Sequence, residues 1–300
     1  PKKEASQTEL DWIYSLPFKK APHPSYIYPI PAFEMIKDSI TAHRGCYGQC
    51  AFCSIHLHQG STIVSRSQKS ILKEIQTLAQ QPTFKGIVSD IGGPSANMYQ
   101  SFCKIKGCKD PNCLLKDQGN PCPHLQTGIE EYQTLLNQAV HIPKIKQVFI
   151  GSGLRFDKPL ISPSFLHQVL QKHSGGSVKI APESGCDKVL ELMNKPPTRV
   201  FDNFKKMFQA VVLNHQKPPK VLEKPLVPYI IVGHPGEDLE QVKETLNFLI
   251  KQGFRGNQFQ IFTPTPLTLS TAMYYLEENP LTGQKLKVEK DIKKLEQWKN

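Results

Sequence analysis

Short apolar runs alternate with longer amphipathic segments along most of this chain. The apolar runs lie at residues 39–42, 86–89, 147–150, 178–181, 228–232 and 259–262. Runs of this length next to glycine and proline are typical of buried strands. The segments between them have apolar positions three or four residues apart, as on one face of a helix. The alternation predicts βα units around a parallel sheet.

The clearest helical segment follows Ser67, a residue type that often caps the N-terminus of a helix. Apolar residues then recur on one face at Ile71, Leu72, Ile75 and Leu78. Further helices are expected at residues 129–140, 164–173 and 237–252. Six βα units predict an α/β fold, a partial TIM-like (β/α)6 barrel. A doubly wound open sheet is the alternative fold.

Three regions depart from this pattern. Residues 1–35 are rich in proline and aromatic residues, which argues against regular helix and predicts an extended N-terminal arm lying on another surface. Residues 36–283 form the predicted core domain, and residues 284–300 a C-terminal surface helix. Residues 100–127 have no clear period and hold four cysteines, so they are expected to be a Cys-rich insertion that carries function or is disordered.

Composition narrows the class of protein. The chain has 300 residues, of which 39% are hydrophobic, and this is enough for one barrel-sized domain or two smaller ones. There is no apolar run of about 18 residues and no signal peptide at the start, so we expect a cytoplasmic protein without a membrane span. The chain does not begin with Met, which suggests a piece of something longer. A formal net charge of +11 favours anionic partners such as nucleic acid, although scattered Lys and Arg are most often a solvated surface.

Seven of the eight cysteines fall into two groups with ligand-like spacing, which favours metal binding over disulfides. The first group, Cys46, Cys50 and Cys53, follows the first predicted strand. Three thiolates on a 4Fe-4S cluster would leave one iron open to another ligand. A zinc knuckle or a coincidental trio is the alternative.

The second group is Cys103, Cys108, Cys113 and Cys122. Four thiolates can saturate a zinc ion or a 4Fe-4S cluster, and either would organise the loop that carries them. Four free thiols in a mobile lid are the alternative. Cys186 stands alone and is expected to be a buried helix residue.

The spacing Cys-x3-Cys-x-Phe-Cys resembles the cluster motif of the radical S-adenosylmethionine (SAM) superfamily. Further segments resemble the YgiQ family within it, and the resemblance runs from about residue 11 to residue 283. They include Arg44-Gly45-Cys46, Ser65-Arg66-Ser67, Gly93 to Tyr99, Lys179 to Glu183, Thr271 to Tyr275 and Asn279-Pro280-Leu281. In that family the radical domain follows a domain with cobalamin-domain-like architecture, which this sequence lacks.

The resemblance implies that the amino and carboxylate groups of SAM chelate the open iron. An electron from the reduced cluster, delivered by a partner such as flavodoxin or ferredoxin, then breaks the sulfonium bond to give a 5′-deoxyadenosyl radical. It also implies a cofactor site at the carboxyl ends of the strands, lined by Phe52, Gly92, Gly93, Ser152, Glu183, Val232 and Phe262.

Some residues at these strand ends also have a plainer interpretation, among them His234, which follows the fifth predicted strand. A lone Gly-Gly pair is most often a turn. The superfamily's Gly-Gly-Glu element binds the methionine amino group, but here the third position is Pro94, so only the backbone role of the two glycines carries over. Glu183 could be an acid favoured by a helix N-terminus, and His234 a plain loop residue.

The leading hypothesis is therefore a radical SAM enzyme of unknown substrate, with RNA suggested by the charge. One alternative is a metal-stabilised nucleic-acid-binding module without catalysis. Another is a methyl- or methylthio-transferring radical enzyme acting on RNA, in which the second cysteine group would hold an auxiliary cluster. The sequence assigns no catalytic acid or base.

Overall fold

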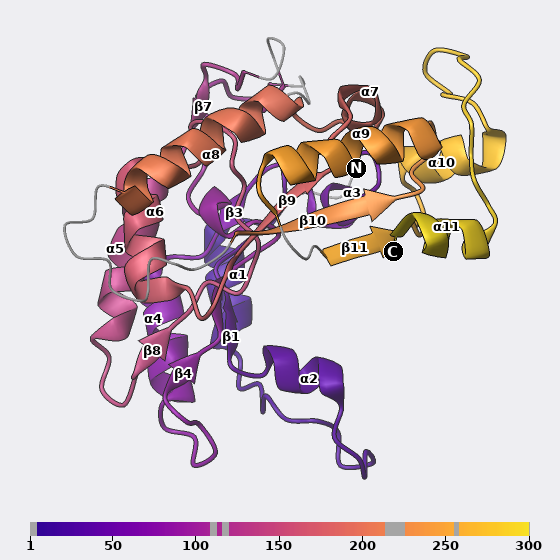
Figure 1. Cartoon of the computed structure of the whole chain (residues 1–300). Helices are drawn as coiled ribbons and strands as arrows, with labels where there is room; N and C mark the ends of the chain where they lie inside the picture. The colour runs from indigo at the N-terminus through magenta and orange to yellow at the C-terminus, as the bar shows by residue number, and fades with distance from the viewer. Residues whose placement is uncertain (1–4, 109–112, 116–119, 214–225, 255–257, 300) are drawn as a thin grey trace.

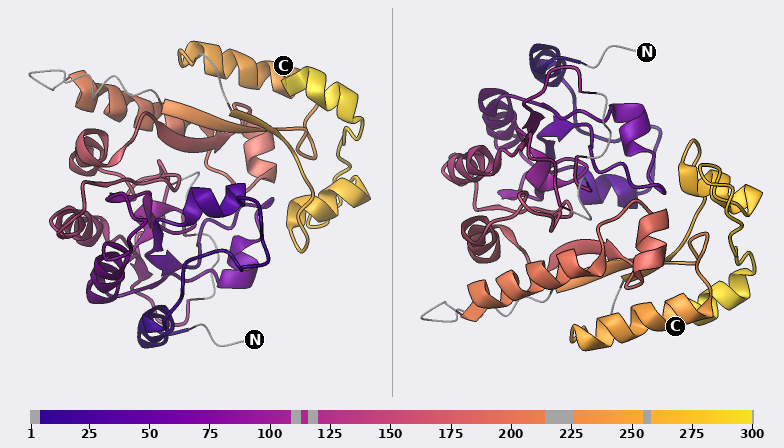
Figure 2. Two further views of the ribbon diagram at one scale, coloured as in Figure 1. Left: turned by 90° about the horizontal axis from the view of Figure 1, so that it is seen from below. Right: turned by 90° about the horizontal axis from the view of Figure 1, so that it is seen from above.

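The computed structural model describes residues 5–108, 113–115, 120–213, 226–254 and 258–299. Helices α4 (Gln68–Leu78), α5 (Ile129–Val140), α6 (Pro163–Gln168) and α8 (Thr198–Leu213) contact one another in succession along one side of short parallel strands (Figure 1). In both views of Figure 2, α9 (Leu239–Lys251) covers the outer face of the last strands. No helix in the described ranges is both long and apolar enough to cross a membrane.

Each of the six segments expected to be strands contains one. β1 (Ser39–Thr41) pairs in parallel with β5 (Asp90–Gly92), and β4 (Ile87–Val88) with β8 (Gln147–Val148). The largest sheet has the order β11-β10-β9, from Gln258–Ile261, Leu226–Val232 and Val178–Glu183. All these pairs are parallel, so the fold is α/β with the carboxyl ends of neighbouring strands at one edge. The sheets are small and separate, joined after β8 by the single bridge Leu154↔Ile180.

Two short antiparallel pairs frame the cysteine groups. β2 (His43–Arg44) pairs with β3 (Val64–Ser65) on either side of the first group. β6 (Phe102–Cys103) pairs with β7 (Leu125–Gln126) at the base of the predicted insertion. Residues 109–112 and 116–119 of that insertion lie outside the described residues.

The helix predictions were largely confirmed. The predicted helix 129–140 matches α5 at both bounds, and the Ser67 side chain caps α4 by accepting a hydrogen bond from Ser70 N. Residues 164–173 divide between α6 and a π-helical turn, Val169–His173. The C-terminal helix, α11 (Ile292–Lys299), begins eight residues after the start of the predicted range 284–300 and packs against β10 and β11. Other helical elements are α3 (Ile55–Gln59), α7 (Asp187–Leu192), α10 (Leu269–Leu276) and the 3-10 turn Ala96–Met98.

The main hydrophobic core lies between these helices and the strands. It includes the apolar faces of α4 and α5 together with Phe165, Val178 and Phe201. The ring of Phe201 packs edge-on against Phe156 and Phe248, with centroids 5.3 and 5.5 Å away. Burial of each such side chain contributes about 1.5–3 kcal/mol. This core fixes the strand ends that carry the site.

The N-terminal prediction was wrong in one respect. Residues Gln7–Ser15 form the helix α1, and Pro31–Ile36 form α2, where no regular helix was expected. No proline occurs in α1, and Ser6 and Glu9 form a capping box at its start. The helix packs against α4, where Asp11 accepts a hydrogen bond from Ser67 N at 3.0 Å. Apart from Pro1, the prolines that suggested an extended chain begin at residue 17.

Candidate metal centre and cofactor site

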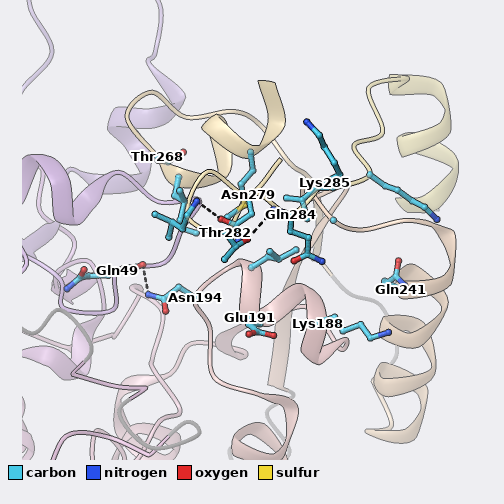
Figure 3. A pocket seen from close by; sticks show the side chains of 18 of the residues that line it. Gln49, Lys188, Glu191, Asn194, Gln241, Thr268, Asn279, Thr282, Gln284 and Lys285 are labelled. Carbon is cyan, nitrogen blue, oxygen red and sulfur yellow. Dashed lines mark hydrogen bonds between the residues drawn. The ribbon is translucent and has the colours of Figure 1, made fainter. Parts of the chain in front are cut away.

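The loop from Cys46 to Cys53, called the cluster loop below, connects β2 to α3 and carries three free, partly buried thiols. Its backbone is tied to distant segments. Ala51 N donates to Met193 O at 2.8 Å, and Ala51 O accepts from Ser270 N at 2.9 Å. The Asn194 amide donates to Gln49 O at 2.9 Å (Figure 3). These bonds hold the loop from its outer side.

A buried ion pair lies against the same loop. The Arg155 guanidinium bonds Asp157 through two nitrogens, at 2.7 and 3.2 Å, and a third nitrogen lies 4.0 Å from Cys50 Sγ. Burial raises the pKa of the Cys46 thiol, and the positive charge of Arg155 counteracts part of that rise. A Cβ on Gly48 would lie 2.5 Å from the same guanidinium, so only glycine fits between Arg155 and the thiols.

The three thiols are the candidate metal ligands of this loop. Among the described residues, no group of three or more His, Cys, Asp or Glu side chains is placed to hold a single ion. Thiolates are the usual protein ligands of iron-sulfur clusters, in which separate thiolates bind separate irons. Soft thiolates beside a buried cation therefore fit such a cluster.

β5 and the segment that follows β8 meet in a hydrogen-bonded group that includes two predicted cofactor residues, Gly92 and Ser152. The Asp90 carboxylate accepts from Gly151 N at 2.8 Å, from Ser152 N at 3.0 Å and from the Ser152 hydroxyl. A Cβ on Gly92 would lie 2.5 Å from that hydroxyl oxygen. The structure thus brings Gly92 and Ser152 together, with the Ser152 hydroxyl already bonded within the protein.

Gly93, the next predicted residue, lies against a histidine that the sequence analysis did not consider. A Cβ on Gly93 would come within 2.6–2.9 Å of Cε1, Nε2 and Nδ1 of His43. His43 is 1% exposed, and burial lowers its pKa to about 4, so the imidazole is neutral at pH 7. Its place between the first strand and the cysteine motif was the one sequence feature that could have drawn attention to it.

Glu183 ends β9 with a positive φ of 72°. It precedes α7 by several residues, so it is not an acid within that helix's first turn. Burial raises the pKa of its carboxyl group, with the positive charges of Lys195 and Arg155 acting in the opposite direction. The Lys195 ammonium itself donates to Ala181 O at 2.6 Å.

The last two predicted strand-end residues are both buried. Phe262 N donates to Val232 O at 2.8 Å, and the Phe262 ring packs edge-on against His234 with centroids 5.3 Å apart. His234 Nε2 lies 2.6 Å from the hydroxyl of Ser270, the residue whose N–H binds the cluster loop. His234 is therefore more than a plain loop residue, because it positions a contact of that loop.

Phe52 packs against a small buried cluster on α7, formed by Cys186, Val189, Leu190 and Met193. Cys186 is buried as expected, but it is the N-cap residue of α7 and not part of the helix itself.

A cavity of about 840 Å³ lies beside the cluster loop (Figure 3). Gln49 and Ala51 form one wall, Lys188 and Glu191 of α7 another, and residues 279–287 a third. None of the predicted cofactor residues lines it. Its lining comes from segments distant in the sequence, which is why no motif indicated it.

The second cysteine group is linked through backbone hydrogen bonds. Cys103 lies across from Leu125 in the β6–β7 pair, Leu125 N donates to Cys122 O at 3.0 Å, and Cys122 N donates to Cys113 O at 2.7 Å. Burial raises the pKa of Cys113 to about 11, and the other three thiols add to the rise. The four thiols therefore lie near one another, although they do not converge on a single ion.

Comparisons with known proteins agree with this picture. The Radical SAM N-terminal family matches residues 1–39. A UPF0313 protein of Methanocella arvoryzae is 42% identical over 288 residues, which cover 95% of this chain and 47% of that protein. A UPF0313 protein of Clostridium botulinum (strain Loch Maree) is 41% identical over 301 residues, covering 98% and 45%. The chain spans about half the length of these curated relatives.

Among solved structures, the fold is similar to that of the radical SAM methyltransferase TsrM from Kitasatospora setae, determined with cobalamin and a [4Fe-4S] cluster bound. The TM-score is 0.51 at 13% identity, over 80% of this chain and 39% of that one. Fold and sequence matches together define the chain as a member of the radical SAM superfamily. Within that superfamily it belongs with the UPF0313 proteins, the YgiQ family that its motifs resemble.

Proposed function

We propose that this chain is the radical-generating domain of an enzyme that reductively cleaves SAM at a 4Fe-4S cluster on Cys46, Cys50 and Cys53, to act on a substrate not yet assigned. The observation that carries the proposal is a three-thiol loop beside a buried Arg155, in a member of this superfamily. When bound, the cluster supplies the electron that breaks the sulfonium bond of SAM and releases a 5′-deoxyadenosyl radical. A non-catalytic binding module would not need an incomplete ligand set.

The parallel strand pairs support a partial (β/α)6 barrel as the architecture of this domain. They follow chain order from β1 to β11, and carboxyl ends of neighbouring parallel strands lie at one edge; the cluster loop follows β1 and β2 in the chain. In such barrels the active site lies at that edge. We therefore propose Phe52, Gly92, Gly93, Ser152, Glu183, Val232 and Phe262 as walls of the SAM site.

The chain's own residues prepare this site. Arg155, held by Asp157, stabilises negative charge on the thiolates, since an opposite charge nearby favours the ionised form of a thiol. Gly48 leaves room for the Arg155 guanidinium and Gly92 for the Ser152 hydroxyl, because a Cβ at either glycine would collide with that side chain. Cluster loop bonds from Asn194 and Ser270 fix the backbone between the thiols.

The test is anaerobic reconstitution with iron and sulfide, followed by dithionite and SAM, with 5′-deoxyadenosine measured by chromatography. The wild-type chain should form it, and Ala at any one of Cys46, Cys50 or Cys53 should abolish it. Cys186→Ala is the matched control, since Cys186 lies in neither group, and it should retain activity. Undiminished product from a variant of the three-thiol site would refute the assignment.

We also propose that Cys103, Cys108, Cys113 and Cys122 hold a second metal centre, either zinc or an iron-sulfur cluster. Ordering the loop costs about 1–2 kcal/mol of backbone entropy per residue, and a structural metal can contribute about 10 kcal/mol or more. Elemental analysis should find metal in a chain that lacks the first three cysteines, and replacing Cys108 and Cys113 should remove it. Metal-free protein with four alkylatable thiols would contradict this.

For the remaining partners, we propose a low-potential protein such as flavodoxin or ferredoxin as electron donor, because the cluster must be reduced. The charge of +11 keeps RNA among the candidate substrates. Methyl or methylthio transfer is the second candidate reaction, because the solved structure of similar fold is that of a methyltransferase. Product analysis with methyl-labelled SAM separates transfer from hydrogen abstraction.

A further inference from the structure

The hairpin formed by β6 and β7 has two different faces. Its register pairs Phe102 with Gln126 and Cys103 with Leu125. Successive side chains of a strand point to opposite faces, so the first pair lies on one face of the hairpin and the second pair on the other. The exposure of these side chains tells which face is turned toward the protein.

The face with Cys103 and Leu125 is the inner one. Leu125 is 6% exposed and belongs to a buried cluster that includes Tyr47 of the cluster loop. Cys46 and Cys113 both pack against the same cluster. The inner face therefore joins the second cysteine group to the first and fixes the hairpin close to the candidate 4Fe-4S site.

The opposite face is open to solvent. The Phe102 side chain is 58% exposed. Lys104 N donates to His124 O at 3.0 Å, which continues the ladder and places these two exposed residues on the same face as Phe102. We call Phe102, Lys104, His124 and Gln126 the hairpin face. In Figure 1 the label of β7 marks it at the upper edge of the molecule.

Positive charge gathers here without a counter-charge. Ile105 and Lys106 follow directly and are also exposed. Neither Asp nor Glu occurs in residues 99–108 or 120–128. Within the described part of the chain, neither Lys104 nor Lys106 forms an ion pair. Both ammonium groups are therefore available to an anionic ligand.

An exposed aromatic ring next to lysines suits one class of ligand. Aromatic side chains stack on the unpaired bases of single-stranded nucleic acid, while lysines attract its phosphates. A duplex keeps its base faces stacked inside, and an acidic polypeptide would use the lysines but offer no flat partner for Phe102. His124 and Gln126 add hydrogen-bonding groups on the same face.

We propose that the hairpin face binds single-stranded nucleic acid, with Phe102 stacked on a base and with Lys104 and Lys106 against the phosphates. Because the inner face packs on Tyr47, a strand bound here lies close to the candidate cluster. The inference names a substrate class and rests on the proposed function for the reaction that follows. Binding itself requires neither SAM nor an electron.

The first experiment titrates a labelled single-stranded RNA of about 12 nucleotides, a usual length for such sites, with the anaerobic, cluster-loaded chain and follows fluorescence anisotropy. Phe102→Ala should weaken binding about 5- to 150-fold, through the loss of one stacked base. Phe102→Trp keeps a flat ring and should retain the affinity. Lys104→Gln with Lys106→Gln should make the slope of log affinity against log salt shallower by about 1.4, since each phosphate contact contributes about 0.7.

The matched controls change equally exposed residues elsewhere. Tyr28 is 78% exposed and precedes α2, which lies at the lower side of the molecule in Figure 1. Lys285 and Lys290 are exposed and paired with Glu278 and Glu277, at 2.7 and 2.6 Å. Tyr28→Ala, and Lys285→Gln with Lys290→Gln, should both bind RNA like the wild type.

Single-stranded DNA of the same sequence is the second probe. Equal binding of both probes would support recognition through bases and phosphates alone, and tighter binding of RNA would add a contact to its 2′-hydroxyl groups. Polyglutamate is the third probe. If it competes as well as RNA does, the hairpin face belongs to an acidic protein and the inference is overturned.

Unchanged RNA affinity in Phe102→Ala would also overturn the inference. If that variant does not fold, the double lysine variant decides, and an unchanged salt slope would have the same meaning. The proposed function fails separately. A chain that forms 5′-deoxyadenosine but binds neither RNA nor DNA keeps the function and loses the inference, whereas RNA binding through Phe102 without 5′-deoxyadenosine does the reverse.

Discussion

Removing one partner of the buried Arg155–Asp157 pair tests how the cluster loop is supported. Asp157 is 2% exposed and Arg155 8% exposed, and Asp157→Asn would leave the guanidinium without its counter-charge. Breaking a buried ion pair in this way costs about 3–5 kcal/mol. For a chain of this length 1 kcal/mol corresponds to roughly 2 °C, so the Tm should fall by about 6–10 °C.

The measurement is the Tm of the chain before reconstitution, obtained from anaerobic thermal unfolding that is monitored by circular dichroism. The double variant Arg155→Met with Asp157→Leu should be less destabilised than Asp157→Asn, because no unpaired charge remains. Asp238→Asn is the matched control: its salt bridge to Lys287 is at the surface and should change the Tm by about 2 °C or less. A Tm for Asp157→Asn within 2 °C of the wild type would refute the argument.

This pair also has a pH signature. Burial raises the pKa of Asp157, but the Arg155 guanidinium outweighs it and holds the pKa below its ordinary value. A carboxyl group with a lowered pKa contributes stability that is present above its unfolded-state pKa of about 3.9 and is lost as the pH falls through the folded-state pKa. The wild type should therefore lose more stability in acid than Asp157→Asn does.

Three further changes have defined outcomes. Burial raises the pKa of Glu237 to about 7, so the native state holds an extra proton and stability should fall as the pH rises from about 4.5 to 7. Urea unfolding of Glu237→Gln should lack this fall, and an identical pH profile would contradict it. Leu114→Ala, beside Tyr47 in a buried cluster, should cost about 2–5 kcal/mol in urea unfolding and loosen Tyr47 next to Cys46, which a lower retained iron content would report. Ser6→Ala removes the capping box of α1 and should cost about 1 kcal/mol; an unchanged Tm would argue against that helix packing on α4.

Local patterns predicted most of the secondary structure. Apolar spacing alone located α5 at both bounds, and the Ser67 cap located the start of α4. The helix α1 was missed because prolines from residue 17 onward were taken to describe the whole arm. The capping box formed by Ser6 and Glu9 can be recognised in the sequence. It favours a helix at residue 7 in spite of the later prolines, since a cap acts only on the helix next to it.

The site was predictable only where its residues are adjacent in sequence. The three-thiol spacing is local and specific, whereas the contact between Arg155 and Cys50 joins residues about a hundred positions apart. His43 could not be recognised as unpaired before its surroundings were known, because pairing depends on tertiary contacts. The cavity beside the cluster loop could not be predicted either, because its lining residues come from segments far apart in the sequence.

The backbone bonds of the cluster loop have a consequence for the order of events during synthesis. Ala51 is held by Met193 and Ser270, so the loop cannot reach its final shape until both have left the ribosome. At about 5–20 residues per second, Ser270 follows the thiols by roughly 10–45 s. During that interval the three thiols are translated but not yet fixed in place. Iron-sulfur delivery after Ser270 has emerged would find a formed loop, whereas oxidants that arrive earlier would meet cysteines that are not yet fixed in place.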